Sequence, residues 1–155
     1  MFIGSSPCNG WTYNQHTKKC YKFVPKSLTF TDARNECKRI ARRNGGRSGV
    51  VQADLASVHS YQEVNFLNSL VGTPSVWLGA TLLRNGQWAW TDGSEWDFTY
   101  WIPGRPKDPE NLGAFIIMAN NNGFHGRWNN VRFSTSTTSN GGYVCQYLNI
   151  NQFSG

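Results

Sequence analysis

The chain has 155 residues, of which 15 are basic, nine are acidic, seven are tryptophan and four are cysteine. Charged residues make up only 15% of the sequence and aromatic residues 14%, which excludes a disordered chain and favours one domain with a hydrophobic core. No apolar run reaches the roughly 18–20 residues that a membrane-spanning helix requires, so the sequence predicts no membrane span.

The four cysteines form no C-x-x-C pair, which argues against a zinc ribbon or a thioredoxin-like site. Two disulfides are the better interpretation, and four cysteines allow three connectivities. Disulfides persist in oxidising compartments, so we expect a secreted protein. The first seven residues lack the basic and apolar segments of a signal peptide, so a leader is expected to have been removed already.

Two helices are predicted in the first half of the chain. The first extends from Thr31, its expected N-cap, to Arg43, and its apolar residues recur at helical spacing, namely Ala33, Cys37, Ile40 and Ala41. The second begins at Ser60, which forms a capping box with Glu63, and ends before the Gly and Pro that follow Leu70.

After residue 74 the sequence changes to short apolar segments bounded by turn residues. This pattern predicts strands over residues 76–82, 87–91, 114–119, 126–129 and 142–147. Asn85 and Gly86 predict a hairpin turn between the first two strands. The segment between Thr91 and Asn111 has no periodicity, and a long segment of this kind inside a compact domain is usually functional.

A series of short motifs occurs in a fixed order along nearly the whole chain. The motifs are Cys8–Trp11, Cys20–Phe23, Leu28–Ala33, Ala53–His59, Trp77–Ala80, Trp88–Gly93, Trp101–Gly104, Trp128–Asn129 and Tyr143–Cys145. Together they resemble the C-type lectin-like domain family in its long form, and the run from Trp96 to Trp101 is also similar to secreted nematode members. The resemblance implies an α+β fold with two helices, two small antiparallel sheets and a long irregular loop.

The resemblance also implies domain limits and disulfide pairs. Residues 1–7 are expected to be a linker, residues 8–148 a single domain and residues 149–155 a C-terminal tail. The implied pairs are Cys8 with Cys20 and Cys37 with Cys145. The family's usual further bond in the loop region is missing, because its two positions hold Leu112 and Phe133, which we expect to pack together.

Calcium-dependent members of the family hold Ca²⁺ and sugar with a Glu-Pro-Asn or Gln-Pro-Asp triplet, a following Glu and a Trp-Asn-Asp motif. Here the triplet is Arg105-Pro-Lys107, and Asn130 replaces the aspartate, whereas Glu110 and Asn129 remain. Two cations in place of oxygen ligands repel a divalent ion. We therefore predict that no calcium binds at the matched positions.

One alternative stays open. The segment Asp108-Pro-Glu110 lies three residues further along and can serve as a displaced triplet with Asn129 and Asn130. The chain would then be a calcium-dependent carbohydrate-binding lectin, with Ca²⁺ as its cofactor.

The two cations at the triplet have three interpretations. The Lys107 ammonium can replace the ion and pair with Glu110 and the Asn129 amide oxygen. Arg105 and Lys107 can instead bind a sulfate, phosphate or carboxylate on a glycan or lipid head group, with Trp96 as an aromatic contact. The third interpretation is two solvated surface charges.

A second group of basic residues lies in and after the first predicted helix. It consists of Arg34, Lys38, Arg39, Arg42, Arg43 and Arg47. Such a face either binds heparin-like polyanions or an acidic membrane, or is simply solvated.

Other function classes find little support in the sequence. No recognised DNA-reading motif or RNA-stacking platform accompanies the basic residues. Catalytic motifs are absent, and His16, His59 and His125 are scattered, so we predict that the chain is not an enzyme. The leading hypothesis is a secreted, calcium-independent module that binds an extracellular protein or anionic glycan. An antifreeze-like or structural domain is a third class.

Overall fold

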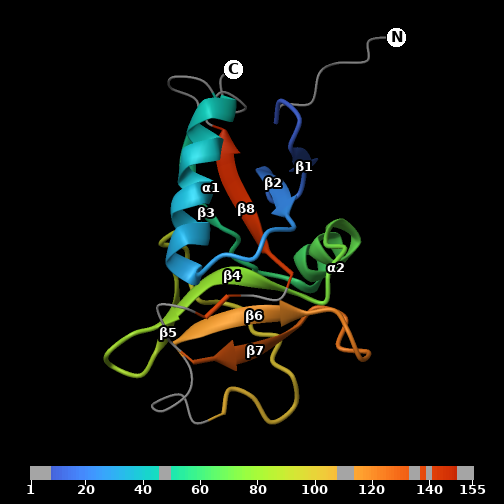
Figure 1. Ribbon diagram of the computed structural model, residues 1–155, viewed down its shortest axis with the longest axis vertical. Coiled ribbons are helices and arrows are strands. Elements are labelled where there is room, and N and C mark those ends of the chain that lie inside the picture. Colours follow the sequence, from blue (N-terminus) through green and yellow to red (C-terminus); the bar gives the residue numbers. More distant parts are fainter. Residues whose placement is uncertain (1–7, 46–49, 108–113, 133–136, 139–140, 150–155) are drawn as a thin grey trace.

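The computed structural model describes residues 8–45, 50–107, 114–132, 137–138 and 141–149, without side chains at 43–45, 50–52 and 149. These residues form an α+β domain with two helices and eight strands (Figure 1). In chain order the elements are β1 (Thr12–Asn14), β2 (Lys19–Val24), α1 (Phe30–Gly45), β3 (Val50–Leu55), α2 (Tyr61–Leu70), β4 (Ser75–Leu82), β5 (Trp88–Trp90), β6 (Phe115–Ala119), β7 (Arg127–Val131) and β8 (Tyr143–Asn149).

The strands form one mixed sheet in the order β1-β2-β8-β4-β6-β7, with β3 also paired to β8 and β5 to β4. Within each of the two groups, β1-β2-β8-β3 and β5-β4-β6-β7, neighbouring strands are antiparallel, as the resemblance implies. A single parallel pair, Trp77 with Tyr143, joins the groups. In Figure 1 the first group stands beside α1, and the second crosses below it.

Local capping signals fix where both helices begin. The Ser60 hydroxyl accepts a hydrogen bond from the Glu63 N–H, so the predicted cap of α2 is confirmed. The cap predicted for α1 is wrong by two residues: the helix already includes Thr31, and the Thr29 hydroxyl accepts the bond from the Asp32 N–H. Two threonines lie close together there, and only the chain's path decides which one precedes the first turn.

The core divides into two clusters of buried side chains. One surrounds the disulfides and includes Trp11, Phe30 and Trp77. Both implied disulfides are present, with Cα–Cα distances of 5.5 Å for Cys8–Cys20 and 5.2 Å for Cys37–Cys145. The other cluster lies between α2 and the strands β4 to β7, and the loop after β5 packs against it.

Gly79 explains why a glycine stands in the Trp-Leu-Gly-Ala strand. A Cβ at this position would lie 2.7 Å from the Leu55 carbonyl oxygen and 2.8 Å from the Thr91 hydroxyl. The absence of a side chain therefore lets β4 approach the end of β3 and the start of the loop. In the part of the chain that the structure describes, no helix is long and apolar enough to cross a membrane.

Candidate functional site

The segment after β5, residues 91–107, is irregular but attached to β7 by backbone hydrogen bonds. The Trp128 N–H donates to the Tyr100 carbonyl at 2.7 Å, and the Ile102 N–H donates to the Trp128 carbonyl at 2.9 Å. Trp101 and Trp128 form a parallel bridge. We call residues 91–107 the binding loop, and these bonds place its second half alongside β7.

Aromatic rings of the core pack against the binding loop. Trp128 is fully buried, and four ring centroids lie 5.4–5.9 Å from its own, those of Trp90, Trp96, Phe98 and Trp101. Each such pair contributes about 0.5–1.5 kcal/mol beyond the burial of its surface. Trp96, the aromatic ligand contact predicted from the sequence, is half-buried within this cluster, and its contact with a ligand stays a prediction.

The triplet at the end of the binding loop is held by Asn130. The Lys107 N–H donates to Asn130 Oδ1 at 3.0 Å, and Asn130 Nδ2 donates to the Lys107 carbonyl at 2.9 Å. Asn130 is only 6% exposed, while Lys107 is exposed. The peptide bond between Arg105 and Pro106 is cis. Asn130, predicted as a ligand residue, therefore fixes the backbone of the triplet instead of presenting its oxygen to solvent.

The described residues at the triplet do not fit a calcium ion, which needs six to eight oxygen ligands. The oxygen of Asn130 already accepts a hydrogen bond, and Arg105 and Lys107 bring positive charge. Asn129 Oδ1 is buried and has no hydrogen-bond partner among the described residues. The described part of the chain contains no group of three or more His, Cys, Asp or Glu side chains that could hold a metal ion.

Several predictions about the loop fall on residues outside those that the structure describes. These residues are Asp108, Glu110, Leu112 and Phe133. The displaced triplet and the packing of Leu112 on Phe133 remain predictions for that reason. The proposed pairing of the Lys107 ammonium with Glu110 likewise stays untested, and no hydrogen bond joins that ammonium to Asn129 in the described residues.

Cationic side chains are frequent in the segments that form and flank the triplet. The described segments 98–107 and 114–132 carry four, namely Arg105, Lys107, Arg127 and Arg132, while the acidic Asp97 immediately precedes the first segment and Asp108 and Glu110 follow it in the sequence. The Arg127 guanidinium lies 4.3 Å from the centre of the Tyr100 ring and donates to the Trp101 carbonyl at 3.1 Å. Arg127 is thus fixed on the loop, whereas Lys107 and Arg132 are exposed.

The basic face predicted on α1 is partly neutralised. Arg34 Nε donates to both carboxylate oxygens of the buried Asp54, at 3.0 and 3.1 Å, and its Nη2 donates to the Thr91 carbonyl. Lys38 lies 4.0 Å from Asp54, and Arg39 pairs with Glu36. Arg34 therefore ties α1 to β3 and to the start of the binding loop. Of the remaining basic residues, Arg42 is exposed, and the side chains of Arg43 and Arg47 are not described.

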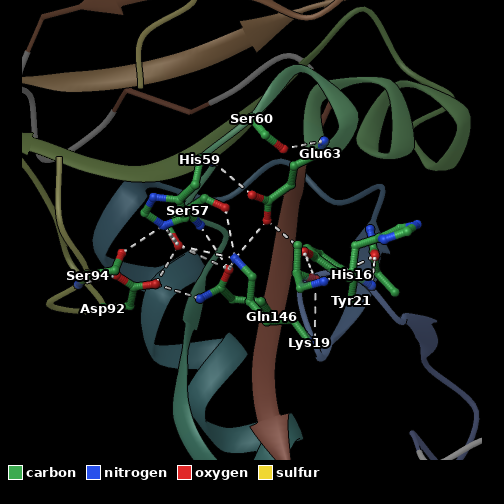
Figure 2. A network of polar contacts seen from close by, with 12 residues as sticks. His16, Lys19, Tyr21, Ser57, His59, Ser60, Glu63, Asp92, Ser94 and Gln146 are labelled. Carbon is green, nitrogen blue, oxygen red and sulfur yellow. Dashed lines mark hydrogen bonds and ion pairs between the residues drawn. The ribbon is translucent and has the colours of Figure 1, made fainter. Parts of the chain in front are cut away.

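A buried ion pair that the sequence analysis missed joins β2 to α2 (Figure 2). Lys19 Nζ lies 2.7 Å from Glu63 Oε2, and their side chains are 9% and 0% exposed. The ammonium also donates to Gln146 Oε1 and the Ser57 carbonyl. Burial, followed by the adjacent Glu63 carboxylate, raises the pKa of Tyr21, so its hydroxyl remains protonated and donates to Glu63 at 2.6 Å. Glu63 gave a signal in the sequence only as part of the capping box.

His59 lies between Ser94 and Asp97 at distances that resemble a catalytic triad. Nε2 is 3.0 Å from the Ser94 hydroxyl, and Nδ1 is 2.7 Å from Asp97 Oδ1. The Ser94 and Ser57 hydroxyls, however, donate their protons to the Asp92 carboxylate. The group therefore anchors the start of the binding loop to the segment before α2, and His59 is not placed to accept a proton from Ser94 (Figure 2).

Comparison with known proteins places this arrangement in a family. The family model described as "Lectin C-type domain" matches residues 26–147. A lectin of Pleurodeles waltl is 32% identical over 111 residues, which cover 68% of this chain and 56% of the relative. The galactose-specific lectin nattectin of Thalassophryne nattereri is 32% identical over 108 residues, which cover 66% of this chain and 60% of the relative. The chain thus spans little more than half the length of these curated relatives.

A solved structure supports the same assignment. The C-type carbohydrate-recognition domain of cow CD23, crystallised in the presence of a GlcNAc2Man3 oligosaccharide, has a TM-score of 0.70 at 27% identity and covers 89% of this chain and 92% of that one. The matched region includes both helices, the binding loop and the cysteines of the long disulfide. This chain therefore belongs to the C-type lectin domain family, whose members are binding modules rather than enzymes.

Proposed function

We propose that this chain is a secreted, calcium-independent module that binds anionic groups of an extracellular glycan or protein at Arg105 and Lys107. The observation that carries the proposal is the pair of hydrogen bonds between Asn130 and the Lys107 backbone. These bonds occupy the side-chain amide of Asn130, which would otherwise be available to a metal ion. They also fix the backbone of the triplet, while the Lys107 side chain is exposed to solvent. Two disulfides and lectin relatives support an extracellular location.

The chemistry of the triplet suits an oxyanion. A guanidinium donates two parallel hydrogen bonds to a sulfate or carboxylate, and an ammonium adds a point charge with three donors. Arg127 and Arg132, on and after β7, add positive charge to this region, while Asp108 and Glu110 follow the triplet in the sequence and oppose it. The binding energy should therefore be largely electrostatic and should fall as salt increases.

A polyanion column tests this proposal. The protein is applied to immobilised heparin and eluted with a sodium chloride gradient, together with the variant R105Q/K107Q. We expect the variant to elute at clearly lower salt, since it loses the two cations of the triplet. The single variant R105Q is included as well, so that R42Q, which removes one exposed cation from α1 outside the binding loop, is a charge-matched control.

Two results would contradict the proposal. If the wild-type protein binds neither heparin nor a sulfated protein ligand at low salt, the proposal that its ligand is anionic is wrong. A loss of retention in R42Q, with R105Q/K107Q unchanged, would assign the polyanion site to α1 instead of the binding loop.

The second candidate function is a calcium-dependent carbohydrate lectin that uses Asp108 and Glu110 with Asn129. The observation in its favour is Asn129 Oδ1, which is buried and has no hydrogen-bond partner among the described residues. Calcium that binds only the folded state raises the unfolding midpoint by mass action. We expect no rise when millimolar Ca²⁺ is added to chelator-treated protein. A rise that D108N/E110Q abolishes would establish the lectin instead.

A further inference from the structure

A hollow of about 560 Å³ lies on the surface between the β1–β2 hairpin and α2. Its lining includes Tyr13, Gln15 and His16 from the hairpin and Gln62, Asn65 and Phe66 from the helix. Figure 1 shows the hairpin beside α2. The hollow is shallow and open to solvent, so a ligand bound in it keeps one face in water. We call this hollow the hairpin groove, and neither Arg105 nor Lys107 lines it.

Both walls of the hairpin groove are fixed by internal contacts. Asn14 Oδ1 accepts hydrogen bonds from the His16 N–H at 2.9 Å and from the Thr17 N–H at 3.3 Å, which fixes the turn of the hairpin. On the helix side, the Phe66 ring lies 4.8 Å from the ring of Tyr21. The groove is therefore formed before a ligand arrives, which lowers the entropic cost of binding.

The side chains of the groove define the class of ligand. Gln15, Gln62 and Asn65 are exposed, and no hydrogen bond to another described residue occupies their amides. Each amide can both donate and accept. Among the described residues that line the groove there is no Asp, Glu, Lys or Arg, although the chain as a whole has a net charge of +6.

We infer that the hairpin groove is a second binding site and that its ligand is a neutral saccharide. Sugar hydroxyls both donate and accept, as the three amides do, and the apolar C–H face of a sugar ring packs on the exposed parts of Tyr13 and Phe66. A neutral ligand also suits a groove whose described lining holds no Asp, Glu, Lys or Arg, because it brings no charge that such a side chain would have to neutralise. Binding here is therefore expected to be independent of salt and of calcium, in contrast to the triplet.

Nuclear magnetic resonance of the side-chain amides tests this inference directly. Cellotriose, maltotriose and chitotriose are titrated separately to millimolar concentration into uniformly ¹⁵N-labelled protein, with chelator present and at low and high salt. We expect one of them to shift the Gln62 and Asn65 amide signals in a saturable, salt-independent way. In Q62A/N65A the affinity should fall about tenfold, the loss expected for two hydrogen bonds. The matched control is Q87A, which removes an exposed amide from the turn before β5.

The variant R105Q/K107Q separates this site from the proposed triplet site, because it should keep the saccharide response while heparin retention falls. Two results of the titration would overturn the inference: no saccharide of the panel shifts the groove signals, or a saccharide shifts signals of the binding loop alone. A retained response in Q62A/N65A, whose substitutions lie on the exposed face of α2, would also contradict it.

Discussion

Two disulfides join the region around α1 and β8, whereas stacked rings and backbone hydrogen bonds join the region around β7. The first, which we call the disulfide half, comprises β1, β2, β3, β8 and α1. The second, the loop half, comprises β4 to β7 and the binding loop, and no cysteine lies in it. An irregular loop can thus be held in place without a disulfide when a buried ring, that of Trp128, packs against Trp96, Phe98 and Trp101 and backbone hydrogen bonds join the loop to β7.

The largest expected effect comes from the long disulfide. The Cys37–Cys145 bond spans 108 residues, and the chain-entropy model assigns it about 4–5 kcal/mol, against about 3 kcal/mol for the Cys8–Cys20 bond that spans 12. C37A/C145A should therefore lose more of the free energy of unfolding than C8A/C20A in urea titrations. Equal losses in the two variants would show that strain or denatured-state structure, and not loop length, determines their contributions.

The buried ion pair gives the next effect. K19M removes the ammonium and leaves the Glu63 carboxylate uncompensated in the core, so the free energy of unfolding should fall by about 3–5 kcal/mol. K19M/E63Q is the control, because it removes the unpaired charge and should recover most of the loss. If the double variant is no more stable than K19M, packing around Lys19 and not charge carries the effect.

Trp96 tests the loop half by itself. W96A removes a half-buried ring from the aromatic cluster and should cost about 3 kcal/mol. Native-state hydrogen exchange should show faster exchange at the N–H groups of Trp128 and Ile102, which bind the loop backbone, than at those of β2. W96F should restore most of the protection. A uniform increase over both halves would show that they unfold as one unit.

The smallest effect concerns pH. Burial alone raises the pKa of Asp92, but hydrogen bonds from Ser57, Ser94 and Gln146 outweigh it and hold the pKa below its ordinary value. A lowered pKa contributes stability that is present above the unfolded value of about 3.9 and is lost as the pH falls through the folded value. D92N should remove this part of the acid dependence in urea titrations below about pH 4. The exposed Glu95 provides the comparison variant, E95Q.

The sequence predicted those parts of the fold that have local signals. The N-cap at Ser60, the strands after residue 74 and the resemblance-based pairing of the four cysteines are confirmed, whereas the Glu63 carboxylate accepts from the His59 N–H and so does not complete the predicted capping box. Lys19 gave no such signal, because it follows Lys18 as an ordinary surface charge would, and its partner Glu63 is 44 positions away along the chain. Pairing across that distance is decided by tertiary packing.

In the candidate site, too, contacts between segments distant in the sequence could not be predicted. Asn130 was selected from its position in the Trp-Asn-Asn motif, but only the path of the binding loop reveals that its amide contacts the Lys107 backbone. The hairpin groove was missed because its lining comes from two segments, around Gln15 and around Gln62, that are polar and unremarkable when read separately. Convergence of this kind is a property of topology and is not encoded in either segment.

The span of the long disulfide also has a consequence for biosynthesis. Because Cys145 follows Cys37 by 108 residues, a ribosome that adds about 5–20 residues per second exposes the Cys37 thiol for roughly 5–20 s before its partner is made. During that interval Cys8, Cys20 and Cys37 are present together, and each of the three can react with either of the others. If Cys8–Cys20 closes first, neither cysteine remains to react with Cys37, and the two wrong pairings are blocked, so the short bond would then act in oxidative maturation as well as in stability.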